Sequence, residues 1–162
     1  MDIIRAPWRM AYIGSDEKIT DCIFCVYPQE DNDAENLILH RGNYAFVMLN
    51  RYPYATGHLL VIPYRHTSDL TTLTVEEGAE MLELTQKSIQ AIEVASKPHG
   101  YNLGMNLGKT AGAGIDAHLH LHIVPRWDGD TNFMSVTAET KVLPEALSAT
   151  REKLLSVWPK NA

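Results

Sequence analysis

The chain has 162 residues, of which 45% are hydrophobic and 21% are charged. This length is enough for a single domain with a hydrophobic core, residues 1–162, and this composition excludes a disordered or fibrous protein. No apolar run approaches the ~18 residues that span a bilayer, and we expect a cytoplasmic protein with no membrane partner. The net charge of −6 argues against a nucleic-acid polymer as a partner.

The predicted elements begin after an irregular N-terminal arm at residues 1–20. Residues 21–28 form a short turn that carries two cysteines, and an acidic loop follows it. Runs rich in β-forming residues predict strands over 36–40, 44–49 and 58–63, of which the first two form a hairpin.

A long helix is predicted next, since Thr74 and Glu77 have the spacing of a capping box and Pro98 with Gly100 ends the pattern near residue 96. Apolar and small residues recur along it at steps of three and four, which predicts one buried stripe. The stripe consists of Met81, Leu82, Thr85, Ser88, Ile89, Ile92 and Ala95.

Two more strands, over 101–107 and 117–124, flank a glycine-rich loop at residues 108–116. A tail follows from residue 125 and contains a short helix over 144–157. This order predicts an α+β fold with a mainly antiparallel five-stranded sheet, one long helix and a C-terminal helix.

The most informative stretch is the alternating sequence that contains His118, His120 and His122. In a strand, alternate side chains point to opposite faces, so the three imidazoles share one face and the leucines between them share the other. A single strand histidine is usually an ordinary polar residue, whereas three at strict alternation favour a functional site. Metal binding by all three and nucleophilic or acid–base chemistry are both open interpretations.

The glycine loop favours the second interpretation, because backbone N–H groups can approach an anion closely where no Cβ intervenes. The loop leads directly into the histidines, which would place phosphate oxygens beside imidazole nitrogens. A neutral imidazole is a good nucleophile near neutral pH and a good leaving group from phosphorus. The arrangement therefore suits phosphoryl or nucleotidyl transfer.

The sequence HLHLHIVP at residues 118–125 resembles the motif of the histidine triad (HIT) superfamily of nucleotide hydrolases and transferases. Similarity extends over about residues 20–126, through CIFC, the strand that ends at Asn50, ATGHLLVIPYRH, the long helix and NLGMNLG. The flanking segments 6–13 and 125–134 resemble the branch of diadenosine tetraphosphate phosphorylases and related hydrolases.

The resemblance implies that His120 attacks the α-phosphorus of a dinucleoside polyphosphate and forms a nucleotidyl-histidine, which water or phosphate then cleaves. It implies that His122 hydrogen-bonds the leaving oxygen and that the carbonyl group of His118 orients the ring of His120. His58 corresponds to a further histidine near the site. Two alternatives stay open: a nucleoside phosphoramidase or nucleotidyltransferase, and a non-catalytic nucleotide-binding module.

The resemblance also implies substrate contacts, a homodimer that pairs through the long helix and the fourth strand, and no organic cofactor. Asn50 corresponds to the residue that holds the ribose and Asn106 to one in the phosphate channel. The backbone amides of Gly112, Ala113 and Gly114 would hold phosphate oxygens. Gly114 is a departure, because many members have Gln or Ser there.

The CxxC pair, Cys22 and Cys25, fits a zinc site, a redox pair or two small buried residues. A redox pair would be expected beside a thioredoxin-like βαβ pattern, which is missing. The resemblance implies a structural Zn²⁺ site made by both cysteines with His66 and His118. Such a site would fix His118 and, through its carbonyl group, the ring of His120.

Overall fold

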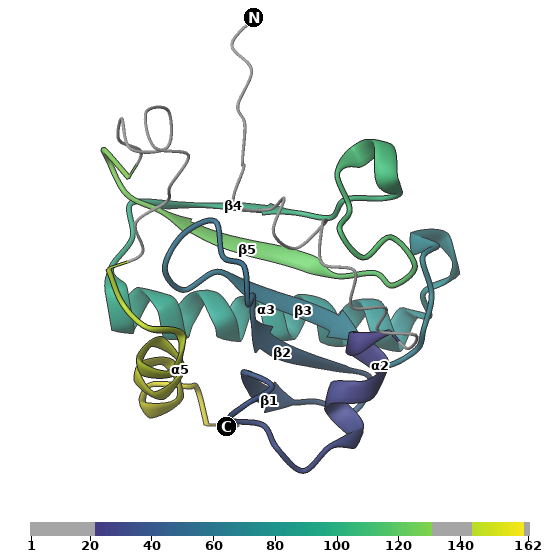
Figure 1. The fold of residues 1–162 in the computed structure, drawn as a ribbon, viewed down its shortest axis with the longest axis horizontal. Helices are drawn as coiled ribbons and strands as arrows, with labels where there is room; N and C mark the ends of the chain where they lie inside the picture. The colour runs from purple at the N-terminus through teal and green to yellow at the C-terminus, as the bar shows by residue number, and fades with distance from the viewer. Residues whose placement is uncertain (1–21, 131–143, 161–162) are drawn as a thin grey trace, which may run out of the picture.

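The computed structural model describes residues 22–130 and 144–160 (Figure 1). Its five strands form one sheet in the order β1-β2-β3-β5-β4, and each neighbouring pair is antiparallel. The strands are β1 (Ile38–Arg41), β2 (Ala45–Leu49), β3 (Leu59–Pro63), β4 (Gly100–Gly104) and β5 (Leu121–Arg126). The predicted α+β class with a five-stranded antiparallel sheet is therefore confirmed. The predicted N-terminal arm lies outside the described residues, as does segment 131–143 of the predicted tail.

The last two strands differ from their predicted bounds. β5 begins at Leu121 and continues through Pro125 to Arg126, instead of running over 117–124. The residues just before it leave the sheet, because the Leu119 N–H donates to the Thr67 carbonyl group at 2.8 Å. β4 stops at Gly104, opposite His122, so the predicted continuation to residue 107 is wrong.

The long helix α3 (Val75–Ser96) begins where the capping box predicts. The Thr74 hydroxyl accepts from the Glu77 N–H at 3.2 Å, and the Glu77 carboxylate accepts from the Thr74 N–H at 2.8 Å. The predicted stripe is wrong at Leu82, which is 61% exposed. The buried face is instead rotated towards Leu84 and Ala91, which pack in the core beside the sheet.

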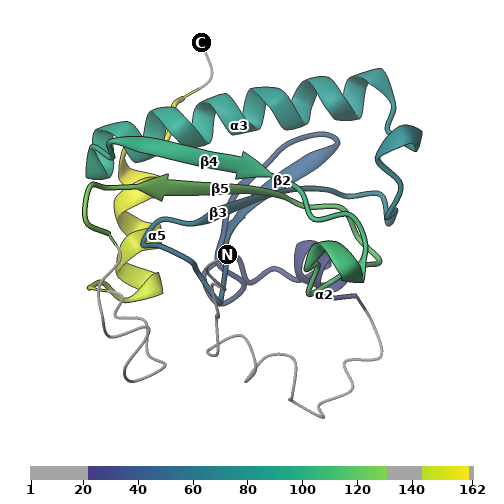
Figure 2. The same cartoon turned by 90° about the horizontal axis from the view of Figure 1, so that it is seen from above.

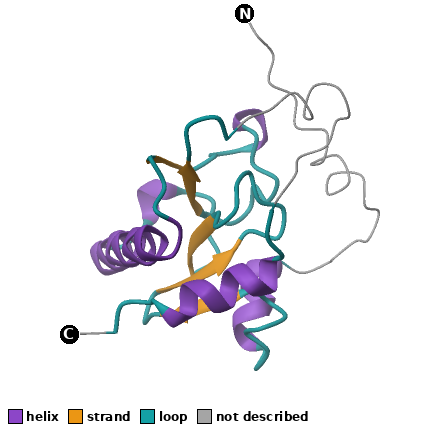
Figure 3. Ribbon diagram, turned by 90° about the vertical axis from the view of Figure 1, so that its left-hand side faces the viewer, coloured by secondary structure: helices purple, strands orange, loops and turns teal. Residues whose placement is uncertain are grey.

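Alternation along the strands divides the core between the two faces of the sheet. One face packs against α3 and α5 (Leu147–Ser156) and the other against the short helix α2 (Ile23–Val26). Figure 2 shows α3 and α2 on opposite sides of the sheet, and Figure 3 shows α3 end-on beside the strands. In β3, Leu59 and Val61 belong to the α3 face, whereas Leu60 and Ile62 belong to the α2 face.

The C-terminal helix is shorter than the predicted range 144–157, and it packs on α3 and β1. Its buried Arg151 donates from Nε to the Ile38 carbonyl group at 3.0 Å. Three 3₁₀ turns complete the described structure: η2 (Tyr27–Gln29), η3 (Leu70–Thr72) and η4 (Lys109–Ala111). Within residues 22–130 and 144–160, no helix is both long and apolar enough to cross a membrane.

The turn between β1 and β2 is closed by a carboxylate from α3. Glu80 accepts hydrogen bonds from the backbone N–H groups of Asn43, Tyr44 and Ala45. The approach is so close that a Cβ atom on Gly42 would lie 2.8 Å from the Glu80 carboxylate and from the Ala45 carbonyl oxygen. Glycine at this position is therefore a steric requirement of the turn.

Candidate functional site

His120 immediately precedes β5 and His122 is the second residue of that strand, and both are buried on the α2 face of the sheet. Their ring centroids lie 4.9 Å apart. His120 donates from Nδ1 to the His118 carbonyl group at 2.8 Å. Because this bond uses the Nδ1 proton, the neutral ring has its lone pair on Nε2.

The ring of His118 does not lie beside the rings of His120 and His122, although strict alternation predicts three imidazoles on one face. Its Nε2 donates to the Pro63 carbonyl group at 2.8 Å, and its Nδ1 lies 3.3 Å from the Cys22 sulfur. The ring can turn because residues 117–120 are not part of the sheet. Consequently His118 faces the cysteines, while its carbonyl group faces His120.

His58 lies beside His122 in the same buried region. Its Nε2 is 2.9 Å from Nδ1 of His122. His58 immediately precedes β3, and His122 lies in the neighbouring strand β5. Asn50 lies next to this pair, with its Nδ2 atom 3.5 Å from either ring nitrogen of His58. The structure therefore brings together four predicted site residues: Asn50, His58, His120 and His122.

Two aromatic residues that the sequence interpretation missed also contact these imidazoles. Phe24 of α2 lies 5.6 Å from the ring of His118 and 5.1 Å from that of His120. Tyr54 lies 4.6 Å from the ring of His58 and 5.7 Å from that of His122. Phe24 stands inside the CxxC motif and Tyr54 stands four residues before His58. Their closeness in sequence to these motifs is the feature that could have identified them as site residues.

The predicted substrate loop is exposed and follows β4. Gly108 and Gly112 have positive φ values of 81° and 89°, which favour glycine, and the Asn106 amide donates to the Gly112 carbonyl group at 3.4 Å. Ile115 packs against the apolar cluster of the α2 face. The loop residues Asn106, Gly112, Ala113 and Gly114 thus precede a segment that is anchored on the same face as His120 and His122.

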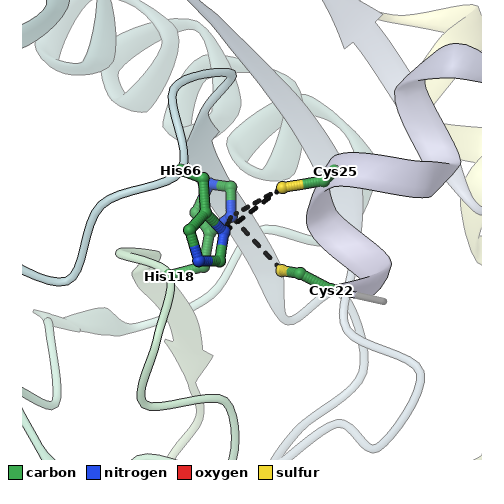
Figure 4. Close-up of side chains that lie close together, drawn as sticks. All are labelled: Cys22, Cys25, His66 and His118. Carbon is green, nitrogen blue, oxygen red and sulfur yellow. Dashed lines mark hydrogen bonds between the residues drawn. The ribbon is translucent and has the colours of Figure 1, made fainter. Parts of the chain in front are cut away.

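The four predicted metal ligands, Cys22, Cys25, His66 and His118, form a cluster (Figure 4). Their ligand atoms all lie within 4.8 Å of one another. Of the three alternating histidines, His118 alone belongs to this cluster. The four residues could therefore hold a metal ion. Among the described residues, His120 and His122 do not belong to this cluster, so the interpretation in which all three alternating histidines bind one metal is wrong.

The distances in the cluster fit a tetrahedral site. Zinc bond lengths of ~2.3 Å to sulfur and ~2.0 Å to nitrogen require sulfur–nitrogen separations of about 3.5 Å. The sulfur atom of Cys25 lies 3.3 Å from His66 Nδ1 and 3.5 Å from His118 Nδ1, and the two Nδ1 atoms are 3.3 Å apart.

The protonation of His118 also fits a ligand. Its Nε2–H donates to the Pro63 carbonyl group, so the Nδ1 lone pair faces the cysteines. Burial lowers the pKa of His118, which favours the neutral form that binds metals. Burial also raises the pKa of Cys25, with the neighbouring Cys22 adding to the effect, so a metal ion would have to displace this thiol proton.

Comparisons with known proteins identify relatives that belong to the histidine triad family. The HIT domain family matches residues 31–129. A protein of Mycobacterium tuberculosis named AP-4-A phosphorylase is 41% identical, and the similarity covers 96% of this chain and 83% of that protein.

Two solved structures share the fold. A Zn-bound histidine triad family protein from Mycobacterium smegmatis has a TM-score of 0.68 and 28% identity, covering 85% of this chain and 93% of that chain. The diadenosine triphosphate hydrolase of Plasmodium falciparum, at 18% identity, has a TM-score of 0.59 and covers 75% of this chain and 73% of that chain. The predicted resemblance is confirmed, as is the prediction of an enzyme of this family: the chain belongs to the HIT domain family.

Proposed function

We propose that this enzyme cleaves dinucleoside polyphosphates of the diadenosine tetraphosphate type at the α-phosphorus, with His120 as nucleophile. The proposal depends on one observation, the 2.8 Å hydrogen bond from His120 Nδ1 to the His118 carbonyl group. This bond leaves the Nε2 lone pair of a neutral imidazole for attack. A nitrogen–phosphorus bond forms as the bond from phosphorus to the leaving oxygen breaks.

The neighbouring groups support the same reaction. His122 donates a hydrogen bond to the leaving oxygen as negative charge develops there, and His58 holds His122 through the 2.9 Å contact between their nitrogens. Asn50 holds the ribose. Asn106 and the amides of residues 112–114 hold phosphate oxygens.

The acceptor that releases the nucleotide from His120 is phosphate or water. The relative named AP-4-A phosphorylase supports phosphate. Incubation with diadenosine tetraphosphate in the presence and absence of phosphate separates the two outcomes. Formation of ADP and ATP that requires phosphate identifies a phosphorylase, whereas AMP and ATP formed in water identify a hydrolase.

The nucleophile is tested in the same assay by His120→Ala, for which we expect a loss in kcat of at least about 10³-fold. His99→Ala is the matched control, because His99 is exposed and its ring bonds to the Asp128 N–H, outside the site. Undiminished turnover by His120→Ala would refute the assignment. Binding without turnover by the wild type would indicate a nucleotide-binding module, and cleavage of a nucleoside phosphoramidate alone would indicate a phosphoramidase.

We propose that the Cys₂His₂ cluster holds a structural Zn²⁺ ion. The tetrahedral distances support this, as does the zinc in the related Mycobacterium smegmatis protein. All four positions are protein ligands, so the metal has no open position for substrate. When bound, it supplies a rigid link between α2, the segment after β3 and His118. We place the enzyme in the cytoplasm, where thiols stay reduced and can bind a metal ion.

We also propose a homodimer that forms through α3 and β4. β4 is an edge strand of the described sheet, so one of its sides has backbone groups available for another chain. Tyr101 of β4 contacts α3, since its hydroxyl donates to the Glu93 carboxylate at 2.9 Å. Leu103 stands on the same side of β4 and is 50% exposed, and Leu82 of α3 is 61% exposed. These leucines support an apolar contact between protomers.

A further inference from the structure

The loop between β2 and β3 is closed around His58. The Asn50 N–H donates to the His58 carbonyl group at 2.9 Å, and the His58 N–H donates to the Ala55 carbonyl group at 3.1 Å. Inside the loop Pro53 is buried, and its ring restricts φ to about −65°. The next amide, that of Tyr54, donates to Nδ1 of His58 at 3.0 Å. The loop therefore aims one backbone N–H group at one imidazole nitrogen.

This hydrogen bond determines where the protons of two histidines lie. A backbone N–H can only donate, so His58 Nδ1 accepts and carries no proton. The single proton of the ring is then on Nε2, from which it is donated to His122 Nδ1 at 2.9 Å. His122 Nδ1 is an acceptor in turn, and the proton of His122 lies on Nε2.

If the hydrogen bonds through His58 and His122 ran in the opposite direction, His122 would lose the proton on Nε2. With its proton on Nδ1, His58 would accept at Nε2 from an Nδ1–H of His122. His122 Nε2 would then carry only a lone pair and could not donate to a leaving oxygen. The Tyr54 N–H excludes this arrangement, because it would place two N–H groups face to face.

The Tyr54 side chain adds a second constraint on the same rings. Its centroid lies 4.6 Å from that of His58 and 5.7 Å from that of His122, and its plane is within 17° of the His122 plane. Aromatic rings at these separations pack favourably against one another. The phenol ring thus holds both imidazoles at the spacing that their hydrogen bond needs.

We propose that Tyr54 is a positioning residue: its backbone N–H sets the tautomers of His58 and His122 that present a proton on His122 Nε2, and its ring holds the two imidazoles at the spacing of their hydrogen bond. The inference rests on the proposed function, in which that proton meets the leaving oxygen. Tyr54 acts through the two histidines and need not touch the reacting atoms.

Imidazole nitrogen NMR on the full-length protein tests the tautomers without any substrate. We expect the wild type to show Nε2–H tautomers at both His58 and His122, with the signals assigned from His58→Asn and His122→Asn. In Tyr54→Pro, which removes the N–H, we expect a mixture of tautomers at both histidines. Tyr54→Ala is the matched variant, because it removes the ring but keeps the N–H, and it should keep the tautomers.

Kinetics provide the second measurement. For Tyr54→Pro we expect a fall in kcat of about 10- to 100-fold with little change in KM, because a mixture of tautomers loses only part of an acid–base contribution that is typically about 10²- to 10⁴-fold. The fall should be larger for substrates whose leaving group is more basic, because these depend more on the His122 proton. Tyr54→Ala should lose less activity and show no such dependence on the leaving group.

An Nδ1–H tautomer at His58 in the wild type would overturn the inference, as would wild-type tautomers in a folded Tyr54→Pro. If Tyr54→Pro does not fold, the wild-type and Tyr54→Ala spectra decide alone. Failure of the proposed function is recognised separately, because a wild type that does not cleave dinucleoside polyphosphates would leave the NMR result standing. Cleavage together with the wrong tautomers would refute only the role of Tyr54.

Discussion

At the scale of single residues, three alternating histidines have three different surroundings. His118 turns its ring to the cysteines and its carbonyl group to His120, while His122 contacts His58. Two peptide units therefore separate a candidate metal ligand from the proposed nucleophile. A change in the metal cluster is expected to reach the reacting imidazole through the main chain of residues 118–120.

The metal cluster gives the first prediction at this scale. Cys22→Ser should lose bound zinc and lower the free energy of unfolding, by about 4 kcal/mol where zinc is roughly 1,000-fold above its dissociation constant. Metal analysis and denaturant unfolding measure the two effects. The control His99→Ala removes an exposed histidine outside the cluster and should keep both zinc and stability. Full zinc content in Cys22→Ser would refute the ligand set.

Phe24 gives a second prediction, because its ring packs on both His118 and His120. Phe24→Leu keeps an apolar side chain but loses the ring contacts, so we expect kcat to fall together with a destabilisation of about 1 kcal/mol. Phe46→Leu is the matched control: Phe46 is buried in the same cluster but stacks on Tyr64 instead. It should lose stability without a comparable loss of kcat, and equal kcat losses would contradict the role of Phe24.

Alternation predicted correctly that His120 and His122 share a face, and the resemblance predicted which residues gather at the metal cluster. The orientation of His118 could not be predicted from alternation, because it depends on the Pro63 carbonyl group, which is distant in sequence. The roles of Tyr54 and Phe24 could not be predicted either, because they also depend on tertiary contacts. Their contacts depend on how a loop and a short helix fold over the sheet.

At the scale of elements, local signals located the long helix well. Its capping box contains both residue types that satisfy the first N–H groups, and the structure has both hydrogen bonds. The rotation of its buried face could not be predicted in the same way, since Leu82 fits the periodic pattern and yet is exposed. Which leucine is buried depends on how the helix lies across the sheet, and periodicity alone leaves this open.

The start of this helix gives a prediction about pH. Hydrogen bonds from the Arg65 guanidinium and the Thr74 N–H lower the pKa of Glu77 from 4.5 to about 2. A lowered carboxyl pKa stabilises the fold above about pH 4.5, and this contribution is lost as the pH falls towards about 2. Since 41% of the Arg65 side chain is exposed, screening limits the contribution to about 1–2 kcal/mol.

Denaturant unfolding across this pH range checks the effect in Glu77→Gln. We expect the variant to be less stable than the wild type at neutral pH and the difference to shrink on acidification. Glu76→Gln is the control, because Glu76 is exposed in the same turn. A difference that does not change with pH would show that Glu77 contributes through packing and not through its charge.

At the scale of the whole molecule, the sheet has the larger part of the hydrophobic core on one face and the candidate functional site on the other. α3 and α5 cover one face and supply most of the apolar core, while the other face carries α2, the imidazoles of His58, His120 and His122, and the Cys₂His₂ cluster. The site can therefore tolerate polar groups without interrupting the larger core. β4 remains at the edge, next to α3, where the proposed dimer forms.

The dimer gives the prediction at this scale. The wild type should sediment as a dimer, and Leu103→Lys should shift it towards the monomer, because a charge at the contact must be desolvated. Leu70→Lys is the control, since Leu70 has similar exposure at 42% but lies in η3. Analytical ultracentrifugation at several protein concentrations measures the equilibrium. A wild type that is monomeric at micromolar concentration would refute the proposed dimer.

The Glu80 carboxylate in the turn between β1 and β2 has a consequence for how such a molecule handles phosphate. Three consecutive backbone N–H groups of that turn converge on one point, a geometry that attracts anions generally. Because the protein supplies its own anion there, a polyphosphate ligand meets a site that is already filled. A phosphate group would have to displace Glu80 to bind this turn, so the turn does not compete with the phosphate contacts that we propose for residues 112–114.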